Sequence, residues 1–159
     1  MSDPACVFCR IVACELPATF VHADDRVVAF LDVDPVTPGH LLVVPRAHLP
    51  ALEDLDDDTA GRMLQVAKRM AAALRASGLR CEGVNLFYAD GEAAGQEVFH
   101  AHLHVFPRHE GDGFEVSARW GSNPAREELE AIGARIRAAL DARGQEQPDA
   151  AGPGAPGRQ

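Results

Sequence analysis

The chain has 159 residues and a formal net charge of −9; 47% of its residues are hydrophobic and 25% are charged. This balance is typical of a globular protein with a packed core and excludes an intrinsically disordered chain. The negative charge argues against broad binding to DNA or RNA, which needs a basic stripe, so no nucleic-acid partner is expected.

The N-terminal sequence MSDPACVFCR has no basic segment followed by an apolar one. Nowhere in the chain do about 18 apolar residues follow one another, as a membrane-spanning helix requires. We therefore expect a cytoplasmic protein without a membrane partner. In that compartment cysteines stay reduced, as thiols or metal ligands; the four are Cys6, Cys9, Cys14 and Cys81.

The first predicted elements in chain order are two strands and a helix. Apolar, β-branched segments at residues 25–32 and 39–45 flank the turn-like sequence DPVTPG, which predicts a pair of strands. A helix is predicted from about Asp54 to Ser77, because apolar residues recur at helical spacing behind an acidic start and Gly78 follows. Its apolar face comprises Met63, Ala67, Met70 and Leu74.

Two further strands are predicted at residues 83–88 and 98–107, joined by a turn rich in glycine and acidic residues. A second helix is predicted after Asn123 and Pro124, which suit an N-cap and a first turn. Its apolar face comprises Leu129, Ile132, Ile136 and Leu140. The predicted fold class is α+β, with an antiparallel sheet of about five strands and two main helices.

We expect one domain over residues 1–143, closed by the last helix. Residues 144–159 are rich in Pro, Gly, Ala and polar residues and have nothing to bury, so a disordered C-terminal tail is predicted there.

Three histidines, His100, His102 and His104, alternate with apolar residues in the run HAHLHVF. A strand points successive side chains to opposite faces, so it would place all three imidazoles on one face, neighbours roughly 6–7 Å apart. A neutral imidazole is a good nucleophile near pH 7, and a second imidazole can protonate a leaving group. The pattern indicates histidine attack on phosphorus. A polar surface strand and a metal site made of the three histidines are the alternatives.

With this run the sequence resembles the histidine triad (HIT) family, in its bacterial type with an N-terminal CxxC pair. The segments CVFCRIVACELPA, FLDVDPVTPGHLLVVPRAH and GEAAGQEVFHAHLHVFPR match that type in order and spacing, over roughly residues 5–110. The resemblance implies a HIT-like domain that forms a homodimer with a continuous sheet. It also implies hydrolysis or transfer of a nucleoside monophosphate through a nucleotidyl-histidine intermediate.

The resemblance implies catalytic roles for the three histidines. His102 would be the nucleophile, His104 would contact the phosphate or leaving group, and His100 would orient His102. The implied substrates are AMP-like purine nucleotides, either nucleoside phosphoramidates or dinucleoside polyphosphates. A loop of backbone N–H groups can hold the phosphate without basic side chains. The implied nucleotide-binding residues are Asp32 for the ribose, Phe8, Phe30 and Val33 for the base, and Gly95, Gln96 and Glu97 in the phosphate loop.

Two positions depart from the family pattern. Ala89 stands where Asn or Gln is common, and Glu97 stands where Ser or Thr is common. A carboxylate repels a phosphate unless it is protonated or balanced by a cation, so Glu97 either points away or favours a cationic or amine leaving group. These departures keep two other hypotheses open: a nucleotide-binding or scaffold protein with little turnover, and a metal-dependent hydrolase that uses all three histidines.

The pair Cys6 and Cys9 provides half of a tetrahedral zinc site. The resemblance implies that His48 and His100 complete it. Such a closed site would be structural, and no cofactor would be needed for catalysis. The alternative is a pair of reduced cysteines packed as small apolar groups. The other histidines, which are predicted to be surface or packing residues, are His22, His40 and His109.

Overall fold

The computed structural model describes residues 2–118 and 121–146 of the chain. The chain divides into two compact units, residues 1–115 and 116–159, and each is described by itself. A single domain over residues 1–143 therefore stays a prediction. Among the described residues, no helix combines the length and the apolar character needed to cross a bilayer.

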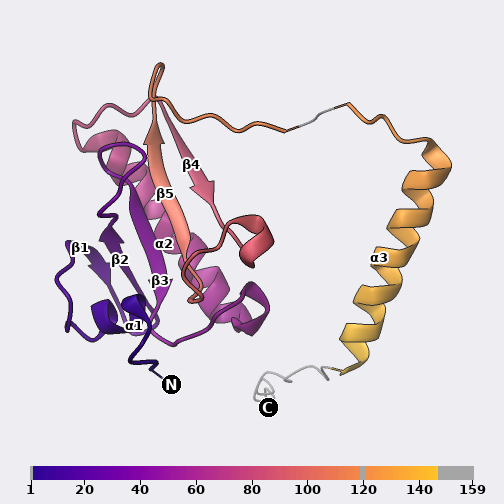
Figure 1. Ribbon diagram of the computed structural model, residues 1–159, viewed down its shortest axis with the longest axis horizontal. Helices are drawn as coiled ribbons and strands as arrows, with labels where there is room; N and C mark the ends of the chain where they lie inside the picture. The colour runs from indigo at the N-terminus through magenta and orange to yellow at the C-terminus, as the bar shows by residue number, and fades with distance from the viewer. Residues whose placement is uncertain (1, 119–120, 147–159) are drawn as a thin grey trace, which may run out of the picture. The chain divides into compact units, whose positions relative to one another are not determined.

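The first unit is built on a five-stranded sheet with the order β1-β2-β3-β5-β4, in which every neighbouring pair is antiparallel (Figure 1). This confirms the predicted fold class and both predicted strand pairs. The first strand was not predicted, because its sequence FVHA has no alternating pattern and only pairing with β2 makes it a strand. The strands are β1 (Phe20–Ala23), β2 (Val27–Leu31), β3 (Leu41–Pro45), β4 (Gly83–Phe87) and β5 (Leu103–Arg108).

Helix α2 (Asp57–Ala76) covers one face of the sheet (Figure 1). Its N-cap is Asp56, whose side chain accepts the Thr59 N–H at 2.7 Å, and the glycine after its end has a φ of +83°. The predicted apolar face is the one that packs on the sheet. The buried residues of this layer are Met63, Val66, Ala67 and Leu74 from α2, and Val27, Ala29, Leu41, Val43 and Val105 from the strands.

A short helix that was not predicted, α1 (Val7–Val12), lies on the opposite face. Alternate residues of β2 and β3 point to this side and are buried as well, so both strands are apolar throughout. The buried cluster here consists of Cys6, Phe8, Cys9, Val28, Phe30, Leu42 and Val44. The histidine run and the N-terminal cysteines therefore meet on the face covered by α1.

Strand β5 begins at Leu103, five residues after the predicted start at Val98. Before it, the His100 N–H donates to the Val98 carbonyl at 2.8 Å, which closes a tight turn, and the Ala101 N–H donates to the Leu49 carbonyl instead of to β3. Two 3-10 helices, η1 (Leu52–Asp54) and η2 (Glu92–Ala94), lie in the connecting loops. His100 and His102 therefore precede the regular strand, and the expectation of one strand carrying all three histidines is wrong.

The second unit contains helix α3 (Arg126–Glu146). It begins after the predicted Asn123 cap: the Leu129 N–H donates to the Ala125 carbonyl, and Asn123 has a left-handed φ of +40°. The helix extends into the predicted tail, whose residues 147–159 lie outside the described residues, as does Trp120. Its predicted apolar residues, Leu129, Ile132, Ile136 and Leu140, are 44–63% exposed in this unit. That α3 closes the first domain stays a prediction.

Candidate active site and metal site

A cavity of about 420 Å³ opens on the sheet face that carries α1. It brings together residues from α1, from strands β3, β4 and β5, and from the segments that connect β2 to β3 and β4 to β5. The site residues predicted from the sequence that line it are Phe8, Asp32, Gly95, Glu97, His102 and His104.

His102 is held by the backbone of its neighbour in the triad. Its Nδ1 lies 2.7 Å from the His100 carbonyl oxygen, which only accepts hydrogen bonds, so Nδ1 carries the proton and Nε2 carries the lone pair. Burial lowers the pKa of His102, and the edge of the Phe8 ring packs against it with ring centroids 5.1 Å apart. The structure thus presents a neutral imidazole with a free nitrogen in the cavity.

The residue that sequence reasoning missed is His40. The Val36 N–H donates to its Nδ1 at 3.1 Å, so its Nε2 carries the proton and donates to His104 Nδ1 at 2.9 Å. The remaining nitrogen of His104, Nε2, is then an N–H donor. His40 is 4% exposed and packs against the Phe106 ring, so of the two expected roles it has the packing one, and in addition it lines the cavity. Only the pairing of β3 with β5, in which Leu42 lies opposite His104, brings the two histidines together.

Burial also lowers the pKa values of His40 and His104. For His104, burial is the largest cause, and the neighbouring His102 and His40 add to it, so its pKa falls to about 4. For His40 burial outweighs the opposing effect of the Asp32 carboxylate. The imidazoles around the cavity are therefore neutral at pH 7.

The loop between β4 and β5 supplies backbone donors, although not the expected ones. The N–H groups of Gly95 and Gln96 donate to the carbonyls of Glu92 and Gly91. The Gln96 side chain is buried and bonds only backbone groups, at Gly91, Pro50 and Val98. Within the described residues, the N–H groups of Glu97 and Val98 have no protein acceptor, so these two are available to an anion.

Of the residues that the resemblance assigns to the ribose and the base, some line the cavity and others do not. Asp32 lines the cavity, and one of its oxygens accepts the Asp34 N–H at 3.0 Å. Phe30 is buried behind Phe8, with ring centroids 5.8 Å apart, and does not line the cavity. Val33 is 95% exposed and does not line it either, so the structure leaves Phe8 as the aromatic wall on this side. Ala89 is buried outside the cavity lining.

The N-terminal cysteines lie beside two histidines, as the resemblance implied. Cys6 Sγ lies 3.5 Å from His100 Nδ1, and Cys9 Sγ lies 3.6 Å from the same nitrogen and 3.3 Å from His48 Nδ1. The four ligand atoms all lie within 4.8 Å of one another. Burial raises the pKa of the Cys6 thiol, so without a cation to bind the thiolate the site favours the protonated form.

These separations fit a zinc ion. A tetrahedral zinc with Zn–S bonds of about 2.3 Å and Zn–N bonds of about 2.0–2.1 Å places a sulfur and a nitrogen ligand about 3.5 Å apart. His100 Nε2 lies 2.9 Å from the Pro45 carbonyl oxygen, so Nε2 carries the proton and Nδ1 directs its lone pair at the thiols. The donor set and the tautomer both suit a closed structural site.

A second cluster of metal-ligand types, Asp32, His40 and His104, lies in the cavity itself. The hydrogen bonds from Val36 to His40 and from His40 to His104 already use three of its four ring nitrogens, and the fourth, His104 Nε2, carries a proton in this tautomer. Among the described residues, no such cluster unites His100, His102 and His104. His100 belongs to the cysteine site, whereas the rings of His102 and His104 lie 4.9 Å apart in the cavity. The three imidazoles thus lie on the face that carries α1, as expected, but they divide between two neighbouring sites.

Known proteins are similar to this chain in sequence and in fold. A family model described as the HIT domain matches residues 13–111. A HIT-like protein of Borreliella burgdorferi is 47% identical over 110 residues, 69% of this chain and 79% of that protein. Adenylylsulfatase HINT3 of Arabidopsis thaliana is 36% identical over 108 residues, 67% of this chain and 54% of that protein. The crystal structure of a zinc-bound histidine triad family protein from Mycobacterium smegmatis aligns with a TM-score of 0.67 at 40% identity, covering 87% of this chain and 97% of that chain. The chain belongs to the HIT family of nucleotide-binding hydrolases and transferases.

Proposed function

We propose that this protein cleaves nucleoside phosphoramidates or dinucleoside polyphosphates, with His102 forming a nucleotidyl-histidine intermediate. The observation that carries the proposal is the hydrogen bond from His102 Nδ1 to the His100 carbonyl, 2.7 Å long. It fixes the tautomer in which Nε2 is nucleophilic, in a cavity that also offers N–H donors. The name of the Arabidopsis relative, an adenylylsulfatase, supports an enzyme that acts on an adenylyl group.

In the first step, the lone pair of His102 Nε2 forms a bond to the α-phosphorus. The bond from phosphorus to the leaving nitrogen or oxygen breaks, and its electron pair leaves with that group, which takes a proton from solvent. The ring becomes cationic, and its Nδ1–H keeps its bond to the His100 carbonyl, which stabilises the charge.

In the second step, a water oxygen bonds to phosphorus and the bond from phosphorus to Nε2 breaks. The electron pair returns to the imidazole, the water proton passes to solvent, and the nucleoside monophosphate is released. One water molecule is consumed in the whole cycle. An alcohol or amine in place of water would give transfer instead of hydrolysis.

The other residues of the cavity bind and orient the substrate in this proposal. His104 donates its Nε2–H to a phosphate oxygen or to the departing atom, and the N–H groups of Glu97 and Val98 hold the phosphate. The Asp32 carboxylate accepts hydrogen bonds from the ribose hydroxyls of an AMP-like purine nucleotide. Phe8 packs against the base.

A turnover panel tests the proposal. Adenosine phosphoramidate, lysyl-adenylate and diadenosine polyphosphates are compared with the wild-type protein and with His102→Ala. We expect turnover by the wild type in the presence of a strong chelator, none by His102→Ala, and a nucleotide on His102 when the reaction is quenched and digested. Full activity of His102→Ala would contradict the proposal.

A nucleotide-binding or scaffold role with little turnover is the second candidate, favoured by Glu97 in the cavity lining. Nucleotide binding without turnover of any member of the panel would support it. Activity that disappears with a chelator and returns with added metal would instead support a metal-dependent hydrolase.

We also propose that Cys6, Cys9, His48 and His100 bind one structural zinc ion, since their donor atoms have the separations that zinc requires. In this proposal the zinc ion links the N-terminal segment, through Cys6 and Cys9, to the turn that carries His100. Metal analysis of protein purified without added zinc tests this, with about one zinc per chain expected. A cytoplasmic location stays a prediction.

A homodimer with a continuous sheet is proposed through strand β4, which lies at the edge of the sheet. Its residues Leu86 and Phe87 are each 45% exposed. An edge strand with exposed apolar residues can pair with a second copy. Light scattering should give twice the chain mass for the wild type and the chain mass for Leu86→Lys; an unchanged mass for the variant would contradict pairing at this edge.

A further inference from the structure

The cavity continues past the catalytic histidines onto three phenylalanines. Along β5, Phe106 follows His104 on the same face, and Phe87 of β4 lies beside His104 with ring centroids 5.9 Å apart. Phe114, in the loop after β5, packs edge-on against Phe106 at 5.1 Å. All three line the cavity beside His104 and His40, whereas Phe8 contacts His102.

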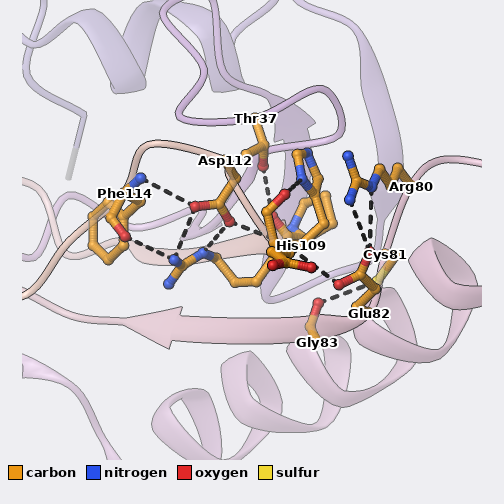
Figure 2. A network of polar contacts seen from close by, with 11 residues as sticks. Thr37, Arg80, Cys81, Glu82, Gly83, His109, Asp112 and Phe114 are labelled. Carbon is orange, nitrogen blue, oxygen red and sulfur yellow. Dashed lines mark hydrogen bonds and ion pairs between the residues drawn. The ribbon is translucent and has the colours of Figure 1, made fainter.

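Phe114 is held unusually firmly for a residue in a loop. The Asp112 carboxylate accepts two hydrogen bonds from the Arg108 guanidinium, at 2.6 and 3.0 Å, and one from the Phe114 N–H at 3.0 Å (Figure 2). Arg108 also donates to the Phe114 carbonyl at 2.8 Å and lies over its ring, 4.6 Å from the centroid. The Asp112 side chain is only 4% exposed.

This arrangement fixes one wall of the cavity before any substrate binds. Both backbone polar groups of Phe114 and one face of its ring are held by Arg108 and Asp112. A preorganised apolar wall improves recognition because no side chain must be ordered on binding.

The negative charge of the cavity lining determines which leaving groups it favours. The carboxylates of Asp32, Asp34 and Glu97 line it, and its lining within the described residues includes no lysine or arginine. A polyphosphate leaving group would place further anions beside these carboxylates, whereas an amine adds no negative charge.

We propose that Phe114, positioned by Arg108 and Asp112, forms the wall of a leaving-group subsite that takes an amine carrying a flat aromatic ring. This inference rests on the proposed function and narrows it: the preferred substrates are nucleoside phosphoramidates of aromatic-bearing amines, ahead of dinucleoside polyphosphates. In the first step the P–N bond breaks with its electron pair going to the amine nitrogen, which takes a proton from solvent while the ring stays against Phe114.

The test compares adenosine 5′-phosphoramidates of benzylamine and of 2-methoxyethylamine, two amines matched in basicity. We expect the wild type to prefer the benzyl substrate in kcat/KM, and Phe114→Ala to reduce that preference by about three- to tenfold. In kcat/KM, the variant should lose less on the methoxyethyl substrate than on the benzyl substrate, and it should keep its preference between adenosine and uridine. Asp112→Asn, which retains the side-chain shape, should reduce the benzyl preference in the same direction.

Phe99→Ala is the matched control, because Phe99 is 52% exposed and does not line the cavity. The subsite would be overturned if Phe114→Ala lost kcat/KM equally on both phosphoramidates. It would also be overturned if the variant changed the preference between adenosine and uridine and kept the preference between the two amines. Phe114→Leu serves if the alanine variant does not fold.

Binding measurements separate this inference from the proposed function. His102→Ala protein is titrated with each phosphoramidate by calorimetry, with and without Phe114→Ala. A benzyl preference that Phe114→Ala removes supports the subsite even if the wild type shows no turnover. No benzyl preference in either protein overturns it, even if the nucleotidyl-histidine forms.

Discussion

His40 Nε2 lies 2.9 Å from His104 Nδ1, and the backbone N–H of Val36 occupies the other nitrogen of His40. The backbone thus sets the tautomer of His40, and His40 sets the tautomer of His104. The consequence is an N–H at His104 Nε2, directed away from His40. His40 is a positioning residue in this arrangement, and it belongs to the site as much as the three histidines of the motif.

Replacing His40 should impair the chemical step. In His40→Ala, His104 is free to take the other tautomer, so we expect kcat to fall about ten- to hundredfold with a small change in KM. The loss should shrink for a p-nitrophenyl ester, whose leaving group needs no hydrogen bond to depart. His22→Ala, which changes a histidine bonded to Asp24 outside the cavity, is the control. Equal losses for good and poor leaving groups would contradict this role.

Acid should destabilise the protein through His104. Its pKa falls from 6.5 to about 4 on folding, so between these values the unfolded chain binds a proton that the folded chain does not. The free energy of unfolding therefore decreases as the pH falls from 6.5 towards 4, by up to about 3 kcal/mol from this residue. Urea unfolding at pH 7 and at pH 4.5 checks this. The free energy of unfolding should decrease less between the two pH values for His104→Gln than for the wild type. Identical decreases would contradict the shift.

Loss of the zinc site should affect stability more than catalysis. We expect Cys9→Ser to lose bound zinc and to lower the free energy of unfolding by several kcal/mol, because metal binding contributes directly to folding. Turnover by the folded fraction should stay near the wild-type value, since the His100 carbonyl still holds His102. Cys14→Ser, at an exposed cysteine, should keep both zinc and stability. Turnover that follows zinc content in proportion would contradict a purely structural site.

The buried Gln96 side chain should be needed for the loop that binds the phosphate. Its amide bonds the Gly91 N–H at 2.7 Å and the carbonyls of Pro50 and Val98 at 2.8 and 3.1 Å. Gln96→Ala leaves these groups unpaired, so we expect a loss of about 1–3 kcal/mol in unfolding free energy and a higher KM. Gln65→Ala, at an exposed glutamine with one side-chain bond to Arg62, should change either quantity little. Stability of Gln96→Ala equal to that of Gln65→Ala would contradict this role.

Glu97 should influence which leaving group is accepted. It lines the cavity, and its carboxylate favours an amine, which can carry positive charge, over a neutral alcohol. We expect Glu97→Thr to lower the preference for amine over alcohol leaving groups, measured as the ratio of kcat/KM values. Glu92→Thr, in the same loop but outside the cavity lining, is the control. If Glu97→Thr left the ratio of kcat/KM for amine and alcohol leaving groups unchanged, this role would be contradicted.

Periodicity and turn residues were enough to predict most of the fold. Helix α2, the two strand pairs and the α+β class follow from apolar spacing, acidic caps and glycine-rich turns, all of which are local in sequence. The first strand and α1 were not predicted, because each is short and is stabilised by what it packs against. The start of β5 was placed too early, because alternation continues through His100 while the backbone has already turned.

The sequence alone determined which chemistry-bearing side chains this protein has: the histidine run, the CxxC pair and the acidic residues of the loop, whose spacing identified the family. Tertiary structure decided how they divide between sites. His100 turns to the cysteines, while His102 faces the cavity and takes its tautomer from the His100 backbone. The pairing of β3 with β5 adds His40, and the loop after β5 adds Phe114. The physical reason is that hydrogen bonds between residues distant in the chain set the tautomer and direction of a ring, and spacing along the chain contains no record of them.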